Sequence, residues 1–397
     1  MKTSVDDLAL FGGPMAFEKT LVVGKPSTGD RAKFYERLEV ALDSGRLTSG
    51  GPLVKEFEAR IAEHAGAKHC IATCNGTIAL EVMARAAGLT GEVIMPSMTY
   101  VATAHAMRYL GLTPVFCDLD PATGCIDPEQ VERLITDRTT GLVGVHLWGQ
   151  PAAIQELEKI AELHNLTLFF DAAHGIGCSF GSQPLGGFGK AEMFSFHAAK
   201  VVTTFEGGAI VTNDDNFAQR ARYTHNFGWG EEHVTEFAGT NAKMSEASAA
   251  MGLTSLDALP ATIAANRAHY ELYAAALAGL PGLEMHRYDE ENRNSYQYNV
   301  VKVDEEECGL SRDTILELLR ADNVLAQRYF SPCVHECEPY RTERPVSLPA
   351  TDAFSRRVLT LPTGPSVTSE QAREVAALVT FAIEHAPEIR RRLASRG

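Results

Sequence analysis

Between residues 69 and 212 the chain alternates short apolar runs with longer amphipathic runs. Runs of helical periodicity predict helices over 76–88, 99–110, 127–136 and 152–165. The run 166–172 is apolar at nearly every position, which is typical of a strand buried on both faces. Strands that alternate with helices predict a mainly parallel seven-stranded sheet between helices. The strands are expected at 69–74, 92–96, 113–119, 140–147, 166–172, 192–196 and 209–212.

The sequence before this region has a different pattern. Residues 1–30 are interrupted by glycine and proline, and we expect an arm or entry loop there. Phe34, Leu38 and Leu42 then follow one another at the spacing of a helix face, and residues 53–61 repeat that spacing. Two helices are therefore expected before the first strand.

The pattern changes again after about residue 244, where a long Ala/Leu-rich helical stretch is interrupted by Pro260. We place a domain boundary near residues 250–260. The chain is expected to divide into an N-terminal arm with a large domain over 1–255 and a smaller α+β domain over 256–397. The smaller domain is expected to contain a strand over 298–303, a helix over 311–321 and a last helix that begins with the capping box of Thr368 and Gln371.

Composition narrows the functional classes. A chain of 397 residues is longer than one ordinary hydrophobic core needs, and 45% hydrophobic with 22% charged residues is typical of a soluble globular protein. The net charge of −15 disfavours binding to nucleic acid or to an anionic membrane. The eight cysteines show no zinc spacing, so we expect reduced thiols and no metal site. The acidic N-terminus and the lack of a long apolar run favour a cytoplasmic protein.

Unusual residues stand at the predicted strand ends, where open α/β sheets bind ligands. Asn75-Gly76-Thr77 follows the first strand and opens a helix, which suits a phosphate, although a plain helix cap is an equal explanation. Tyr100 follows the second strand, where a core tyrosine is the alternative. Asp171 ends the strand 166–172, with His174 three positions later, and a turn aspartate is the alternative. Lys200 follows the strand 192–196; alone, it would be read as a surface lysine.

Together these residues form a set that pyridoxal phosphate requires. The cofactor needs a cup for its phosphate, a ring to stack on, an acid to keep the pyridine nitrogen protonated, and a lysine for its aldehyde. The sequence supplies candidates in the order cup, ring, Asp171 and Lys200. That order makes a cofactor-bearing Lys200 a better interpretation than a surface lysine.

The chain from Gly12-Gly13 almost to its end resembles the sugar aminotransferases of the DegT/DnrJ/EryC1/StrS family, a branch of the fold-type I PLP enzymes related to aspartate aminotransferase. Single pieces of the resemblance are common, and the ordered set is specific. The pieces are Leu47-Thr48-Ser49-Gly50, Asn75-Gly76-Thr77-Ile78-Ala79-Leu80, Pro96-Ser97-Met98-Thr99-Tyr100, Val145-His146-Leu147-Trp148-Gly149, Asp171-Ala172-Ala173-His174, Ser195-Phe196-His197-Ala198-Ala199-Lys200, Gly239-Thr240-Asn241-Ala242-Lys243-Met244-Ser245 and Leu359-Thr360-Leu361-Pro362.

The resemblance implies a role for each matching residue. Lys200 would carry pyridoxal 5′-phosphate and shuttle the proton, and Asp171 would pair with the pyridine nitrogen. Tyr100 would stack on the cofactor ring, and His174 would lie on its O3′ side. The phosphate would be held by Gly76, Thr77 and Ser195, and by Asn241 from the partner of an obligate homodimer.

The reaction implied is amino transfer from L-glutamate to a keto-sugar carried on a nucleoside diphosphate. The segment 195–208 and His225-Asn226-Phe227-Gly228 look most like the branch that aminates C4 of a TDP-4-keto-6-deoxyhexose. Tyr329 and His335 match the family's aromatic and histidine positions near the sugar, and a structural loop explains them equally well. Alternatives are amination at C3 of a sugar or of a cyclitol ketone, and a PLP-binding partner or regulatory protein without catalysis.

Overall fold

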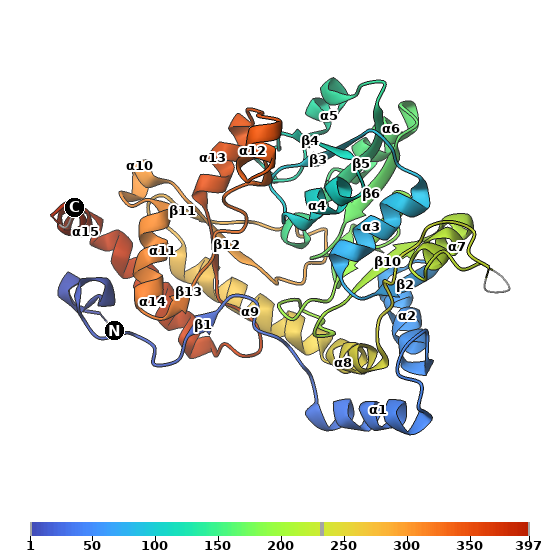
Figure 1. Ribbon diagram of the computed structural model, residues 1–397. Helices are drawn as coiled ribbons and strands as arrows, with labels where there is room; N and C mark the ends of the chain where they lie inside the picture. Colours follow the sequence, from blue (N-terminus) through green and yellow to red (C-terminus); the bar gives the residue numbers. More distant parts are fainter. Residues whose placement is uncertain (1, 231–233, 396–397) are drawn as a thin grey trace.

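A computed structural model describes residues 2–230 and 234–395; Met1, 231–233 and 396–397 lie outside the described residues. Its centre is a seven-stranded sheet with the order β2-β10-β9-β6-β5-β3-β4 (Figure 1). The predicted seven-stranded sheet is therefore confirmed. Its strands are β2 (His69–Thr73), β3 (Glu92–Pro96), β4 (Thr113–Cys117), β5 (Thr139–Val145), β6 (Thr167–Asp171), β9 (Ala191–Ser195) and β10 (Gly208–Thr212).

The sheet is mainly parallel, as predicted. Only β10 runs against its neighbours, pairing antiparallel with β2 and with β9. The register places Val145 opposite Asp171 and Asp171 opposite Met193. Because parallel strands end at one edge, the residues that follow β2, β3, β5, β6 and β9 gather there.

Helices cover both faces of the sheet. Val143 and Phe169 pack in one core with α3 (Gly76–Ala87), α4 (Ala102–Tyr109) and α7 (Asp215–Thr224). Leu168 and Phe170, which point the opposite way, pack on the side of α5 (Pro128–Leu134) and α6 (Ile154–Leu163). Phe194, in β9, packs with α2 (Pro52–Ala65) and α8 (Glu246–Asp257) on that same side. The apolar run over 166–172 is therefore buried on both faces because helices cover both.

The helix predicted over 99–110 begins later, at Ala102. The preceding residues turn instead of continuing the helix, since the backbone carbonyl of Ser97 accepts hydrogen bonds from the N–H groups of Thr99 and Val334. This segment carries residues of the candidate site.

The first predicted helix is present as α1 (Arg31–Ser44), but its apolar face is largely uncovered. Only Ala41 is buried; Val40 and Leu42 are more than half exposed. Helix α2, by contrast, buries Phe57 and Ile61 completely. Helical spacing therefore predicted both helices. Helix α1 lies beside α8 (Figure 1), with Phe34 packed against the core of α2 and α8 and Arg37 bonded to Thr254 and Asp257, and it leaves its other apolar side chains exposed.

The C-terminal third builds a three-stranded antiparallel sheet from β11 (Leu283–Met285), β12 (Asn299–Val303) and β14 (Val358–Leu361). Pro260 lies in the first turn of α9 (Leu259–Leu277), directly after α8 ends. The capping box predicted at Thr368 and Gln371 is confirmed at the start of α14 (Ser369–Glu384).

The N-terminal segment packs on these C-terminal elements. Strand β1 (Leu21–Val22) pairs with β13 (Val324–Leu325), and Val5, Leu8 and Phe17 lie in the same hydrophobic core as α11 (Arg312–Ala321) and α14. The division at residue 255 stays a prediction. The other elements are η1 (Val5–Asp7), η2 (Ala9–Phe11), η3 (Leu147–Gly149), β7 (Ser179–Phe180), β8 (Gln183–Pro184), α10 (Glu305–Cys308), η5 (Val334–Glu336), α12 (Tyr340–Glu343), α13 (Pro349–Arg357) and α15 (Ala386–Ala394). Within residues 2–230 and 234–395, every helix is too short or too polar to span a membrane.

Candidate active site

Asp171 is a buried carboxylate at the end of β6. Asp171 as a whole is only 5% exposed. The Thr103 hydroxyl donates to Oδ2 at 2.8 Å, and the Ala173 N–H donates to Oδ1 at 3.1 Å. Burial raises the pKa of Asp171, while both hydrogen bonds and the nearby Lys200 ammonium act to lower it. Both bonds are donated to the carboxylate, which suits its ionised form.

His174 follows Asp171 and is held by the turn after β5. The backbone N–H of Trp148 donates to its Nδ1 at 3.2 Å. Trp148 has a positive φ of 57°, and the turn continues through Gly149 at 87°. Burial and the neighbouring Lys200 ammonium hold the pKa of His174 well below its usual value. A neutral ring whose Nδ1 is an acceptor carries its proton on Nε2.

Lys200 lies in the loop after β9, with its backbone N–H donating to the His197 carbonyl at 2.9 Å. The residue is partly exposed. Burial of the ammonium among protein atoms lowers its pKa to about 8, against the attraction of Asp171, which acts to raise it. A lysine with a pKa near 8 supplies a useful fraction of neutral amine at physiological pH.

The N-terminal arm forms the other side of the lysine pocket. Gly24 has φ of 76°, and a Cβ there would lie 3.0 Å from the Ala199 Cβ. Gln297 Nε2 donates to the Ala199 carbonyl at 3.1 Å. The hydroxyls of Ser27 and Thr262 are 2.8 Å apart. Gly24, Lys25, Ser27, Ala199, Lys200, Val201, Thr262, Asn266, Gln297, Thr363, Gly364 and Pro365 line this small cavity.

The predicted phosphate cup is built from the start of α3 and two strands. Asn75 caps the helix, its Oδ1 accepting the Ile78 N–H at 2.9 Å. A Cβ on Gly76 would lie 3.3 Å from the Ser195 Cβ, and one on Gly208 would lie 2.7 Å from the Gly76 nitrogen. The glycines therefore bring the helix N-terminus, with Thr77 in its first turn, against Ser195. The first N–H groups of a helix have no acceptor within it and suit an anion.

Aromatic rings surround the open side of the site. Tyr100 is 61% exposed, and its ring lies 6.1 Å from that of Phe330. The Phe330 ring lies almost parallel to His174, with centroids 6.2 Å apart. Tyr329 lies edge-on to Tyr298 at 5.8 Å, and burial with the neighbouring Tyr100 raises the pKa of Tyr329. The structure thus brings Tyr100, His174 and Tyr329 to one place.

His335 is buried behind this group. Its Nδ1 lies 2.7 Å from the Ser97 hydroxyl, and its backbone N–H donates to the same oxygen at 3.0 Å. Its Nε2 lies 3.2 Å from an Asp352 carboxylate oxygen. Both ring nitrogens thus face protein groups, and a contact of His335 with substrate stays a prediction.

Asn241 is exposed on the segment that precedes α8. Lys243 Nζ donates to the side-chain oxygens of Asn241 at 2.6 Å and of Asn226 at 3.0 Å. Within the described residues, no hydrogen bond joins Asn241 to the other predicted site residues. Its role at a partner's cofactor stays a prediction.

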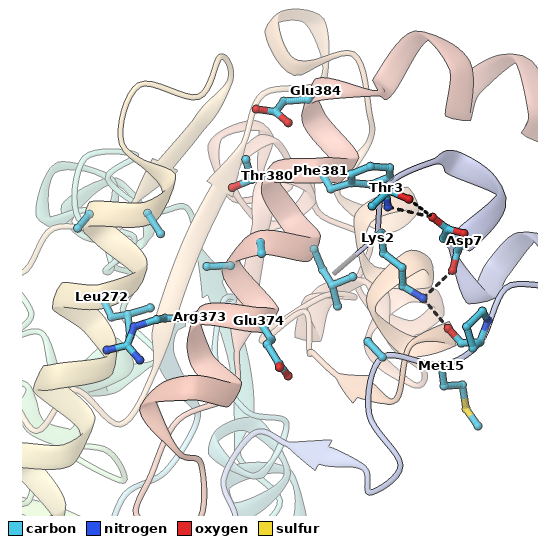
Figure 2. Close-up of a pocket in the computed structure, with 17 residues that line it drawn as sticks. Lys2, Thr3, Asp7, Met15, Leu272, Arg373, Glu374, Thr380, Phe381 and Glu384 are labelled. Atoms are coloured by element: carbon cyan, nitrogen blue, oxygen red, sulfur yellow. Dashed lines mark hydrogen bonds between the residues drawn. The ribbon is translucent and has the colours of Figure 1, made fainter.

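A larger cavity, of about 1090 Å³, lies away from these residues. It runs between α9, α14 and the N-terminal segment, as Leu272 and Arg373 mark in Figure 2. Lys2 closes one end, donating to the Asp7 carbonyl at 2.7 Å and pairing with Asp322 at 2.7 Å. None of the predicted catalytic residues lines it, so size alone would have pointed to the wrong place.

Four contributors to the site were not predicted from the sequence. They are Thr103, the backbone N–H of Trp148, Gly24 and Gln297. Thr103 had a weak signal, because it follows Thr99 by one helical turn just beyond a strand end. Gly24 and Gln297 had none, since they come from segments far from Lys200 in sequence.

These residues fit pyridoxal phosphate on the chemistry of the groups present. The close approach that Gly76 and Gly208 allow brings the Ser195 side chain next to the N-terminus of α3, where N–H groups without an acceptor in the helix suit a phosphate. Asp171 is a buried acceptor for a ring N–H, and Lys200 is an amine of lowered pKa for the aldehyde. Each chemical part of the cofactor thus has a matching group.

Comparison with known proteins agrees with this geometry. A curated relative from Escherichia coli, dTDP-4-amino-4,6-dideoxy-D-glucose transaminase, is 33% identical over 87% of this chain and 94% of its own. GDP-perosamine synthase of Vibrio cholerae is 30% identical over 89% and 96% of the two chains.

Solved structures agree as well. DesI, crystallised in the presence of its TDP-sugar product, is 51% identical with a TM-score of 0.96, covering 98% of this chain and 100% of DesI. DesV of S. venezuelae in complex with a ketimine intermediate is 31% identical with a TM-score of 0.83, covering 91% and 99%. The predicted fold-type I α/β architecture is confirmed by these neighbours. A sequence model of the DegT/DnrJ/EryC1/StrS aminotransferase family matches residues 29–380, and the chain belongs to that family.

Proposed function

We propose that this protein is a PLP-dependent aminotransferase that moves an amino group from L-glutamate to C4 of a TDP-4-keto-6-deoxyhexose. The observation that carries the proposal is the pair formed by Lys200, whose pKa is lowered to about 8, and the buried, hydrogen-bonded Asp171. A lysine and a carboxylate so placed match the two ends of a pyridoxal ring. Membership of an aminotransferase family supports it.

The mechanism divides the work among the chain's own groups. When bound, pyridoxal phosphate would supply an electron sink for the negative charge at the carbon next to nitrogen and would carry the amino group between the two substrates. Asp171 accepts the hydrogen bond of the pyridine N–H and keeps that proton in place. Lys200 Nζ would hold the cofactor through its aldehyde and, once a substrate amine has displaced it, would be a free amine able to accept and return the proton of the substrate carbon next to nitrogen.

The remaining residues orient the cofactor. Neutral His174, with its proton on Nε2, has one N–H to donate to the O3′ side of the ring. Gly76, Thr77 and Ser195 hold the phosphate by the N-terminal N–H groups of α3 and by hydroxyls. Tyr100 stacks on the ring, and Tyr329, with His335 behind it, borders the sugar side.

The choice of sugar and carbon rests on the relatives. DesI was crystallised in the presence of its TDP-sugar product, and the E. coli relative is named for an amino group at C4 of a dTDP-sugar. The V. cholerae relative is named for a GDP-sugar, so the nucleotide base varies among them. Assays with glutamate as donor and a 3-keto or a 4-keto TDP-sugar as acceptor decide between amination at C3 and at C4. A cyclitol ketone is tested as a third acceptor in the same assay.

We also propose a homodimer in which Asn241 reaches the partner's cofactor phosphate. The exposed apolar side chains of α1 support it, since Tyr35 and Leu42, which lie seven positions apart on one face of the helix, are 50% and 58% exposed, as expected of a face that a partner covers. Lys243 beside Asn241 adds a positive charge where a phosphate would approach. The pKa of Lys243 is lowered by burial.

Replacement of Lys200 tests the proposed function. Purified protein with PLP is expected to be yellow, and borohydride should fix the cofactor on Lys200, as read by peptide mass spectrometry. The Lys200→Ala variant is expected to lose turnover of glutamate with the 4-keto sugar by at least about 10³-fold. Full activity in that variant would refute the proposal. Wild-type protein that binds PLP but never yields its pyridoxamine form with glutamate would favour the non-catalytic alternative.

The same variant tests the dimer. Lys200→Ala and Asn241→Ala proteins are each expected to be weakly active, and unfolding and refolding them together should restore up to about a quarter of wild-type activity. One site of each mixed dimer then has both Lys200 and the partner's Asn241 intact. No gain on mixing would contradict the shared site, while the activity of wild type would still stand.

A further inference from the structure

Two buried threonines form a hydrogen-bonded line that ends on Asp171. The Thr103 hydroxyl donates to Asp171 Oδ2 at 2.8 Å, and the Thr99 hydroxyl lies 2.9 Å from that of Thr103. Thr103 is fully buried, and Thr99 is 3% exposed. Neither residue belongs to the cofactor set identified above.

The direction of this line follows from proton counting. A threonine hydroxyl has one hydrogen, and Thr103 uses it on the carboxylate. The Thr103 oxygen is therefore the acceptor in the second bond, and Thr99 is the donor. In this order both hydroxyl hydrogens point toward Asp171. The arrangement suits an ionised carboxylate, because a proton on Oδ2 would face the hydrogen of the Thr103 hydroxyl.

The backbone holds the line in place from both ends. Thr103 lies in the first turn of α4, and Thr99 lies in the turn after β3. That turn is fastened at Ser97, whose carbonyl accepts the Val334 N–H at 3.1 Å and whose hydroxyl accepts the His335 N–H at 3.0 Å. The threonines are therefore fixed before any ligand binds, which favours preorganisation over a chance contact.

We infer that Thr103, aligned by Thr99, is the positioning residue that keeps Asp171 ionised and correctly oriented for the pyridine nitrogen. The inference rests on the proposed function, because it assigns Asp171 to that nitrogen. The groups whose charge acts on Asp171 are Lys200 and His146. The His146 backbone N–H donates to the Asp171 backbone carbonyl, and within the described residues neither side chain donates to the Asp171 carboxylate. Besides the Ala173 N–H, the Thr103 hydroxyl is the donor that the fold supplies.

The test compares Thr103→Val, which removes the hydroxyl and keeps the shape, with Thr103→Ser, which keeps the hydroxyl. In Thr103→Val we expect the Kd for PLP, titrated into cofactor-free protein, to rise about ten-fold or more, because a hydrogen bond to a charged group is lost. The rate constant of the glutamate half-reaction should fall by a similar factor, with the KM for glutamate changed by less than about two-fold. Thr103→Ser should restore both values to within about three-fold of wild type.

Thr360→Val is the matched control, since Thr360 is fully buried in β14, outside the site, and its hydroxyl donates to the Gln327 carbonyl. It should change the melting temperature about as much as Thr103→Val and leave the Kd for PLP unchanged. Wild-type Kd and rate in Thr103→Val, or a Thr103→Ser variant as impaired as Thr103→Val, would overturn the inference while leaving the proposed function intact. Wild-type protein that fails to bind PLP would overturn both. If it binds PLP without transaminating, the Kd values still decide for or against Thr103.

Discussion

Lys200 lies between two walls of different origin. The strand-end wall consists of Asp171, His174, Ser195 and Gly76, which follow strands of the large sheet. The arm wall consists of Gly24, Lys25 and Ser27 with Gln297 and Thr363, which line the lysine cavity from the arm and the C-terminal third. The strand-end wall interacts with Lys200 through the charge of Asp171. The arm wall is shaped by the packing of Gly24 against Ala199.

The difference lies in what fixes each wall. Strand-end residues are placed by the register of the sheet, which pairs Val145 with Asp171 and Gly208 with Ser195. The arm wall depends on single contacts between distant segments, such as Gln297 with Ala199. A single substitution should therefore disturb the arm wall without unfolding the protein. The residues of the strand-end wall should be displaced only when the sheet itself is destabilised.

The largest effect on stability is expected from a buried pair that supports the strand-end wall. Glu192, fully buried in β9, accepts the backbone N–H groups of Gly186 and Phe188 at 2.8 Å each. Its other oxygen lies 3.2 Å from His146 Nε2, at the end of β5. Glu192→Ala should lower the free energy of unfolding by about 3 kcal/mol, because it leaves buried donors without an acceptor. Urea denaturation of the cofactor-free protein measures it.

Glu271→Ala is the control for Glu192. Glu271 pairs with Arg267 at 2.8 Å on the exposed side of α9, and its loss should not change the urea midpoint measurably. Equal destabilisation by the two variants would mean that the strand-end wall does not depend on its buried support.

The arm wall should be sensitive to a single methyl group. In Gly24→Ala the new Cβ would press on Ala199, so we expect the Kd for PLP to rise about ten-fold, with a stability loss of about 1 kcal/mol from the positive φ. Gly12→Ala, in the same arm, shares a positive φ of 102° but has nothing within 4 Å of its Cβ. It should cost similar stability and leave the Kd unchanged. The same Kd in both variants would show that the arm does not shape the lysine pocket.

A pH-dependent effect on the reaction with PLP should depend on both walls, because both bury Lys200. Because burial lowers the pKa of Lys200 to about 8, its amine is mostly neutral above that pH and increasingly protonated below it. The rate at which cofactor-free protein takes up PLP, relative to that of Nα-acetyl-lysine, should thus be raised most below pH 8. The advantage should shrink toward pH 10.5, where an ordinary lysine also loses its proton. A ratio that does not vary with pH would contradict the lowered pKa.

Much of the strand-end wall could be predicted from the sequence, because local patterns encode it. Asp171 was placed at a strand end by the apolar run before it, and Asn75 by the glycine after it. Parallel strands end at one edge of the sheet, so the two residues were expected there together. The resemblance then gave Lys200 and His174 their expected roles. Helical spacing predicted α1 as well, but of its apolar face Phe34 packs on the core whereas Leu42 is 58% exposed in the described chain.

Periodicity determines which face of an element is apolar, and the alternation of strands with helices makes the strands parallel, so that their ends meet at one edge; both patterns depend on neighbours in sequence. Thr103 donates the hydrogen bond to Asp171, and the backbone N–H of Trp148 sets the tautomer of His174. Gly24 packs on Ala199 beside Lys200. Each of these meets its partner across at least 26 positions of the chain, at distances that only packing fixes. The sequence by itself therefore determined the sheet and the reactive groups at its edge, and the tertiary structure decided how those groups are oriented and charged.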